Sequence, residues 1–297
     1  MTDHVADHGF PLEDARLLVE RALDEDLGPG TDVTTMATIP AEQTSVAHLV
    51  ARADGVVAGL PVVALVLEAV AARLGTGAVV LELHVEDGAR VERGDHLATL
   101  AGSTRTTLVA ERTALNVLSR TSGVATHTRR WADELAGSGA MVLDTRKTTP
   151  GMRALEKYAV RCGGGTNKRM GLYDCAMVKD NHKLAAGSLT AAIAAIRDRF
   201  PDVPVQVEVT TTAEALEAVG AGARFLLCDN MSTDHLRATV AAVRDTGETV
   251  EVEATGGLTL EVAAAYAATG VDYLSVGGLT HSSPIVDIAL DLDPSDA

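Results

Sequence analysis

The amino-acid sequence predicts an α/β protein in which a parallel sheet with intervening helices follows a smaller region of mixed helices and strands. Short apolar strand patterns recur from residue 141 onward, and a helical pattern lies between most of them. Parallel strands joined by right-handed crossover helices are the usual outcome of this alternation. The chain has 297 residues, of which 46% are hydrophobic, so it can bury at least one large core.

The first third of the chain is expected to form an α+β region. Apolar residues at helical spacing predict a helix over residues 11–27, which Gly28 ends. Pro61 lies in the first turn of a second predicted helix, which runs to Leu74. Short strand patterns, separated by glycine and aspartate turns, cover residues 45–58, 78–85 and 96–101.

The remaining two thirds begin with a predicted helix over residues 110–118 and then alternate between strands and helices. The six strand patterns are short, apolar and often β-branched, and they cover residues 141–143, 176–178, 205–209, 225–227, 250–252 and 273–276. The helical patterns between them cover residues 153–160, 189–200, 213–219, 234–244 and 260–268.

Each of the six predicted strands ends in charged, hydroxyl-bearing or glycine residues. These residues are Asp144, Arg146 and Lys147; Lys179, Asp180, Asn181 and His182; Glu208 and Thr210; Asp229 and Asn230; Glu253, Thr255, Gly256 and Gly257; and Gly277, Gly278, Thr280 and His281. In an α/β barrel, this end of the strands carries the active site. The alternative is that loops are polar in any protein. That alternative explains less well why charged residues lie so close to apolar strands, where an unpaired charge is costly.

The distribution of charge points to a small anionic ligand. With 25 basic and 41 acidic residues, the formal charge is −16, which argues against nucleic acids and anionic membranes as main partners. Residues 146–183 nevertheless contain nine basic and three acidic residues, so this segment carries +6 and the rest of the chain −22. We interpret the segment as a pocket for a polyanionic small molecule. The alternative, a solvated helix face, accounts for Lys157, Arg161 and Lys183.

Two glycine pairs and two acidic residues extend this interpretation. Glycine loops after the last strands of a barrel commonly bind phosphate, and Gly256-Gly257 and Gly277-Gly278 occupy such positions. Glu208 and Asp229 follow neighbouring strands, and one or two carboxylates with substrate phosphates commonly hold Mg²⁺. Salt bridges to Lys147 or Lys179 are the alternative role for these two acids.

The sequence also suggests a cellular location. The first ten residues lack the apolar stretch of a signal peptide, and charged residues, glycine and proline interrupt the apolar run at 56–74. The cysteines, Cys162, Cys175 and Cys228, are widely spaced and are expected to be buried thiols in a reducing compartment. We therefore expect a cytoplasmic protein.

The motifs resemble those of the nicotinate-nucleotide pyrophosphorylase (carboxylating) family, also called quinolinate phosphoribosyltransferases. The resemblance covers nearly the whole chain, and its most specific stretch is DTRKTTPGMRALEKYAVRCGGGTNKRMGLYD at 144–174. Further matching stretches are EDLGPGTDVTT (25–35), AERTALNVLSRTSGVAT (110–126), VKDNH (178–182), VEV (207–209), CDNM (228–231), EATGGL (253–258) and SVGGLTHS (275–282).

The resemblance implies a fold, a reaction and an assembly. The fold is an open α/β (TIM-like) barrel with an α+β N-terminal sandwich domain, the latter at residues 1–122 together with the tail 285–297, and the barrel at 123–284. The reaction joins quinolinate to phosphoribosyl pyrophosphate (PRPP) with Mg²⁺ and yields nicotinate mononucleotide, pyrophosphate and CO₂. The assembly is a homodimer or hexamer in which Arg112 reaches the neighbouring subunit's site.

The resemblance also implies roles for individual residues. Arg146, Arg169 and Lys179 would hold the carboxylates of quinolinate, which suits a dianion that needs several fixed cations. Lys147 would contact PRPP and act in catalysis. Glu208 and Asp229 would serve the ribose and the metal, also as catalytic residues. The groups expected around the phosphates are Thr255, Gly256, Gly257, Gly277, Gly278 and His281.

Two positions depart from the family pattern. Lys168 occupies the place of the histidine in the family's Asn-His-Arg sequence, and Thr255 stands where serine is common. We expect Lys168 among the substrate-binding residues, although a lysine lacks the histidine's titration near neutral pH. This departure leaves open a paralogous enzyme that acts on another acidic pyridine or azole. Two further alternatives are a Schiff-base lyase that uses Lys179 or Lys147 and a barrel that binds anions without catalysis.

Overall fold

The computed structural model describes residues 9–293, which form two compact units. Unit 1 comprises the chain up to Arg129, Thr148–Gly164 and the chain from Thr280 onward, and unit 2 comprises Arg130–Lys147 and Gly165–Leu279. The units therefore do not follow simple boundaries at residues 122 and 285, because the segment Thr148–Gly164 packs with unit 1. An α/β architecture with a parallel sheet and a separate second sheet confirms the predicted fold class.

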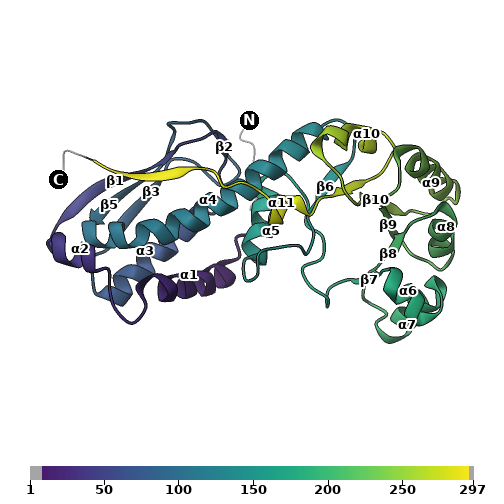
Figure 1. Cartoon of the computed structure of the whole chain (residues 1–297), viewed down its shortest axis with the longest axis horizontal. Coiled ribbons are helices and arrows are strands. Elements are labelled where there is room, and N and C mark those ends of the chain that lie inside the picture. The colour runs from purple at the N-terminus through teal and green to yellow at the C-terminus, as the bar shows by residue number, and fades with distance from the viewer. Residues whose placement is uncertain (1–8, 294–297) are drawn as a thin grey trace. The chain divides into compact units, whose positions relative to one another are not determined.

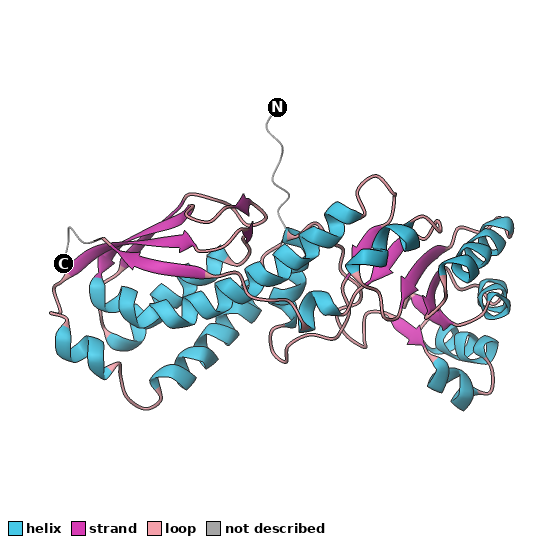
Figure 2. Ribbon diagram, turned by 45° about the horizontal axis from the view of Figure 1, so that its top comes forward, coloured by secondary structure: helices cyan, strands magenta, loops and turns pink. Residues whose placement is uncertain are grey.

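Unit 1 contains a four-stranded antiparallel sheet in the order β12-β1-β5-β3. Its strands are β1 (Thr44–Ala51), β3 (Val79–Leu83), β5 (His96–Ser103) and β12 (Ile288–Leu292), with β2 (Gly55–Val56) and β4 (Arg90–Val91) as a separate pair. Its helices are α1 (Leu12–Leu27), α2 (Val33–Thr38), α3 (Leu60–Leu74) and α5 (Arg153–Cys162), and most of α4 (Thr104–Glu134) belongs to it as well. The sheet forms one layer over the helices (Figure 2).

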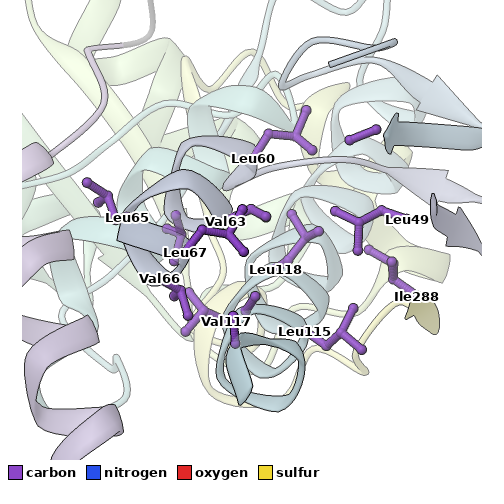
Figure 3. Packing of buried hydrophobic residues seen from close by; sticks show 14 of the residues in the cluster. Leu49, Leu60, Val63, Leu65, Val66, Leu67, Leu115, Val117, Leu118 and Ile288 are labelled. Carbon is purple, nitrogen blue, oxygen red and sulfur yellow. The ribbon is translucent and has the colours of Figure 1, made fainter. Parts of the chain in front are cut away.

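The core of unit 1 is aliphatic, as the low aromatic content predicts. Leu49 of β1 and Ile288 of β12 meet side chains of α3 and α4, among them Val63 and Leu118 (Figure 3). The side chain of Asp87 stabilises the start of α3, because it accepts hydrogen bonds from the backbone N–H groups of Gly59 and Leu60 at 2.9 and 3.0 Å. This carboxylate satisfies donors that the first turn of a helix leaves free.

Unit 2 is built on a six-stranded parallel sheet in the order β6-β11-β10-β9-β8-β7. The strands are β6 (Met141–Leu143), β7 (Ala176–Val178), β8 (Val205–Val209), β9 (Phe225–Asp229), β10 (Glu251–Thr255) and β11 (Tyr273–Ser275). They confirm the six predicted strands within three residues at each end. Because β6 and β7 lie at opposite ends of this order, the parallel sheet is open.

The helices of unit 2 fill the crossovers between these strands. They are α6 (Asp180–Ala186), α7 (Leu189–Arg199), α8 (Thr212–Gly220), α9 (Thr233–Asp245), the 3₁₀ turn η1 (Leu260–Val262), α10 (Ala263–Ala267) and the start of α11 (Gly278–His281). Figure 1 shows α8 and α9 along one side of β8 and β9. Helix α9 buries an apolar stripe formed by Leu236, Val240 and Val243.

Several features differ from the sequence-based expectations. Helices α2, α6 and α11 were not predicted, because each is short and polar and lacks a long apolar repeat. Helix α4 extends well beyond the predicted residues 110–118. The interpretation of Lys157 as part of a solvated helix face is wrong, since this side chain is only 2% exposed. All three cysteines are free and buried, as expected. Among residues 9–293, no helix has the length and apolar content needed to cross a membrane.

Candidate active site

The carboxyl ends of the parallel strands bring several predicted site residues to one edge of the sheet in unit 2. Asp229 ends β9 and lies opposite Thr255, which ends β10. Glu208 of β8 lies opposite Leu227 of β9, two residues before Asp229. Lys179 follows β7 and donates a hydrogen bond from Nζ to Oε2 of Glu208. Parallel strands place all their carboxyl ends together, so residues more than 20 positions apart in sequence become neighbours.

Two arginines beside this edge, Arg146 and Arg169, lie close enough for their positive charges to interact. The Nε of Arg146 is buried and has no hydrogen-bond partner. Arg169 donates from Nη1 to the carbonyl oxygen of Cys175 at 2.9 Å. Burial, followed by the positive charge of Arg146, lowers the pKa of Arg169. Two guanidinium groups that repel each other in this way are stabilised by a bound anion.

The loop that carries Arg169 is fixed by a buried carboxylate. Asp144, directly after β6, has an exposed fraction of 0%. Its Oδ1 accepts the backbone N–H of Lys168 at 2.8 Å, and its Oδ2 accepts the side-chain amide of Asn167 at 2.7 Å. A backbone hydrogen bond from Thr166 to Val142 continues the attachment of this loop to β6. The residues around Arg169 are therefore held by the sheet itself.

Lys168 forms a buried ion pair inside unit 2. Its Nζ lies 2.6 Å from both carboxylate oxygens of Glu253, on β10. The side chains of Lys168 and Glu253 are 6% and 0% exposed. Burial is the main influence on both groups, and it lowers the pKa of Lys168 and raises the pKa of Glu253. Lys168, expected among the substrate-binding residues, is thus joined to an acid that was absent from that predicted set.

Lys179 has a different environment from Lys168. Its side chain is 46% exposed, and its ion-pair partner Glu208 is 12% exposed. The backbone N–H of Lys179 donates to Nδ1 of His182 at 3.1 Å, which orders the first turn of α6. Lys183, on the same turn, bonds Asp180 and Glu214 at 2.7 and 3.0 Å. Its side chain is 13% exposed, so it does not belong to a solvated helix face.

The turn after β10 requires glycine. Gly256 has φ +96, and a Cβ atom there would lie 2.4 Å from Oδ1 of Asn230. Asn230 itself has φ 53, donates its side-chain amide to Asp229 at 2.8 Å, and donates its backbone N–H to Thr255 at 3.0 Å. Gly257 has φ +58 with open space around it. The ends of β9 and β10 are therefore locked together, with backbone close to Asp229 and Thr255.

The acidic residues of this edge fit a cation that is held largely by substrate. Within residues 9–293, no group of three or more His, Cys, Asp or Glu side chains is arranged to hold a metal ion. Glu208 and Asp229 provide two carboxylates, which already accept hydrogen bonds from Lys179 and Asn230. Two carboxylates suit Mg²⁺ that takes its other ligands from phosphate, hydroxyl and water. They do not form a cage of protein ligands.

The remaining predicted residues are Lys147, Gly277, Gly278, Arg112 and His281. Lys147 is exposed, and its backbone N–H donates to the hydroxyl of Thr145 at 3.0 Å. Gly277 and Gly278 follow β11, and Gly278 begins α11. Arg112 and His281 belong to unit 1. The side chain of Arg112 is 65% exposed, and its guanidinium lies 3.8 Å from Glu111.

Asp144 and Glu253 are the two residues of this region that sequence reasoning left out of the predicted site. In the sequence, both appear only as polar residues near strand ends. A signal was present, because each carboxylate adjoins an apolar strand pattern where an unpaired charge is costly. Their partners, Asn167 and Lys168, lie 23 and 85 residues away in sequence, so spacing alone could not pair them.

Comparisons with known proteins agree with this architecture. Residues 32–122 match the family model for the N-terminal domain of quinolinate phosphoribosyl transferase, and residues 124–291 match the model for its C-terminal domain. The chain is 46% identical over 278 residues to a nicotinate-nucleotide pyrophosphorylase [carboxylating] of Mycobacterium leprae, covering 94% of this chain and 97% of that protein.

Solved structures show the same relationship. A nicotinate-nucleotide pyrophosphorylase from Francisella tularensis superimposes with a TM-score of 0.90 at 30% identity, covering 98% of this chain and all of the other. NadC from Streptococcus pyogenes superimposes with a TM-score of 0.88 at 35% identity, covering 95% of this chain and 97% of the other. With both domain models matched in order, the chain belongs to the quinolinate phosphoribosyltransferase family.

Proposed function

We propose that this protein transfers the phosphoribosyl group of PRPP to quinolinate, with loss of CO₂, and forms nicotinate mononucleotide and pyrophosphate. The observation that carries the proposal is the pair Arg146 and Arg169, two guanidiniums beside the strand ends that bear Glu208 and Asp229. Two neighbouring guanidiniums suit a dianionic acceptor, and neighbouring carboxylates suit a sugar that becomes cationic. Family membership supplies the specific reaction.

In this proposal, three cations bind the acceptor. Arg146 and Arg169 face the carboxylates of quinolinate, where planar guanidiniums can form paired hydrogen bonds. Lys179 is half exposed, so its ammonium can contact a ligand while it remains near Glu208. Holding both carboxylates fixes the ring and directs its nitrogen toward the anomeric carbon of PRPP. Fixed orientation of two reactants is a large part of the acceleration in such displacements.

The donor is bound by the remaining groups of the edge. The backbone at Gly256 and Gly257 can approach phosphate closely, because neither residue carries a side chain. Lys147 is exposed and contacts the phosphoribosyl group. Thr255, Gly277, Gly278 and His281 complete the phosphate-binding set implied by the family pattern. Glu208 and Asp229 would hold Mg²⁺ together with the ribose and pyrophosphate oxygens, and the bound ion would neutralise charge on the departing pyrophosphate.

The chemistry then needs these protein groups together with Mg²⁺. The ring nitrogen forms a bond to the anomeric carbon as the bond to pyrophosphate breaks, and the negative charges of Glu208 and Asp229 would stabilise the cationic sugar. The 2-carboxylate leaves as CO₂, and its electron pair is stabilised by the adjacent pyridinium nitrogen. A proton takes the place of CO₂ on that carbon. No organic cofactor is required, because the phosphoribosylated ring itself accepts the electrons.

Three finer expectations belong to the same proposal. The enzyme is a homodimer or hexamer in which Arg112 contributes to the neighbouring subunit's site, and the 65% exposure of its side chain is compatible with that role. The enzyme is cytoplasmic. Its partners are small molecules rather than nucleic acids or membranes, in keeping with a net charge of −16.

The direct test is incubation of the purified protein with quinolinate, PRPP and Mg²⁺, followed by measurement of nicotinate mononucleotide. Product formation that stops when Mg²⁺ is chelated supports both the reaction and the metal. Turnover of another acidic pyridine, with none of quinolinate, would contradict the acceptor and preserve the reaction class. Trapping of substrate on a lysine by borohydride, without Mg²⁺ dependence, would instead indicate a lyase.

A further inference from the structure

Lys168 differs from Arg146 and Lys179 in that its ammonium is buried together with its partner, the carboxylate of Glu253. The Nζ of Lys168 lies 2.6 Å from each of the two carboxylate oxygens of Glu253. Both side chains are almost fully buried, at 6% and 0% exposure. Arg146, in contrast, has a buried Nε without a hydrogen-bond partner, and Lys179 is 46% exposed. The charge of Lys168 is therefore already compensated in the interior, whereas Arg146 keeps a buried Nε that can donate to a ligand and the ammonium of Lys179 is partly open to solvent.

The same pair stabilises the loop that carries Arg169. Residues 166–169 are attached to β6 by backbone hydrogen bonds and by the carboxylate of Asp144. The side chain of Lys168 adds an attachment in another direction, from this loop to Glu253 in the middle of β10. Since β10 lies two strands away from β6 in the sheet, the side chain spans the interior of unit 2. Arg169 is the next residue along the chain.

We propose that Lys168 is a positioning residue, which acts through Glu253 to fix Arg169 and does not itself bind the acceptor. This inference rests on the proposed function, because it assigns the acceptor's carboxylates to Arg146, Arg169 and Lys179 alone. It also accounts for the departure from the family pattern. A cation in this buried place needs an anion beside it, and Glu253 supplies one.

A double-variant experiment separates positioning from direct binding. Lys168→Met leaves a buried carboxylate unpaired, and Glu253→Met leaves a buried ammonium unpaired, so each single variant disturbs the loop. The double variant Lys168→Met/Glu253→Met restores an uncharged, filled interior. We expect each single variant to raise the quinolinate KM about tenfold or more and to change the PRPP KM much less. We expect the double variant to recover most of that loss.

The outcomes are distinct. A folded double variant whose quinolinate KM stays about tenfold above that of the wild type, or is worse than either single variant, would overturn the inference, since it would show that the ammonium contacts the acceptor. If the single variants fail to fold, the double variant alone decides by the same measurement. Wild-type protein without activity in this assay would refute the proposed function, whereas active wild-type protein with an impaired double variant would refute only the inference.

The pair Lys179 and Glu208 provides a matched control. It is also a lysine–glutamate ion pair in unit 2, but its lysine is exposed at the proposed substrate site. Lys179→Met is expected to raise the quinolinate KM, and adding Glu208→Met is expected to cause a further loss, not a recovery. Recovery in both double variants would mean that the experiment does not distinguish the two roles and would remove the support for a special role of Lys168.

Discussion

Replacement of Asp144 tests how the acceptor site is held together. This residue is entirely buried, and its two carboxylate oxygens accept hydrogen bonds from Lys168 N–H and the Asn167 side chain at 2.8 and 2.7 Å. Asp144→Ala removes both bonds and leaves two buried donors without their acceptor. We expect the substitution to loosen the loop that carries Arg169 and to reduce stability together with acceptor binding.

The magnitude follows from these contacts. Hydrogen bonds to a charged group contribute about 1.5–3 kcal/mol each, so two of them amount to about 3–6 kcal/mol in the free energy of unfolding of unit 2. Asp144→Asn should cost less, about 1–2 kcal/mol, because it keeps one acceptor oxygen. Rotation of the Asn167 amide can also turn its oxygen toward the new amide group. The predicted order of stability is wild type, then Asn, then Ala.

The assay uses urea unfolding followed by tryptophan fluorescence. Trp131 is the only tryptophan of the chain and is buried in unit 2, so its signal reports on the relevant transition. Steady-state kinetics should show a larger increase in the quinolinate KM than in the PRPP KM. Asp202→Ala, an exposed acid of the same unit, serves as control and should change stability by less than about 0.5 kcal/mol. Wild-type stability and quinolinate KM in Asp144→Ala would refute the reasoning.

Three further predictions concern other parts of the molecule. Gly256→Ala should lower the activity, and it should lower the free energy of unfolding by about 1–3 kcal/mol. The reason is that φ +96 is unfavourable for alanine and that the new Cβ would lie 2.4 Å from Oδ1 of Asn230. A urea midpoint equal to that of the wild type would contradict this prediction. Burial raises the pKa of Cys228 from 9.0 to about 12. Between these two pKa values the folded thiol therefore keeps its proton while the unfolded thiol loses it, so the free energy of unfolding should fall as the pH rises from 9.0 to about 12. In Cys228→Ala this part of the pH dependence should be missing when unfolding is measured over the same pH range. Mixed dimers of Arg112→Ala and Arg146→Ala should recover activity, because one site of each mixed dimer keeps both arginines; no recovery despite demonstrated subunit exchange would count against a shared site.

The strands and the residues at their ends could be predicted from the sequence because their signals are local. Each parallel strand is a short run of apolar residues, and the chemistry-bearing residues follow it directly, as at Asp229 after β9. The alternation of strands and helices also predicts that the carboxyl ends of the strands meet at one edge of the sheet. Glu208 and Asp229 accordingly lie on neighbouring strands. Short polar helices such as α6 carried no comparable signal.

The partners of the charged residues could not be predicted in the same way. The pairing of Lys168 with Glu253 joins residues 85 positions apart, and it depends on how a loop enters the interior of unit 2. A sequence shows that a buried lysine needs an anion, but several acids follow the strands and any of them could serve. For the same reason, the burial of Lys157 within the basic segment 146–183 could not be predicted from the sequence.

The most direct test of the central claim is the stoichiometry of the reaction with quinolinate labelled in its 2-carboxylate. The account predicts that, with PRPP and Mg²⁺ present, one molecule of labelled CO₂ and one of pyrophosphate form for each molecule of nicotinate mononucleotide. Arg146→Ala should reduce all three products together, because the acceptor is no longer held. Consumption of PRPP without release of labelled CO₂, or release of CO₂ without nicotinate mononucleotide, would contradict the account.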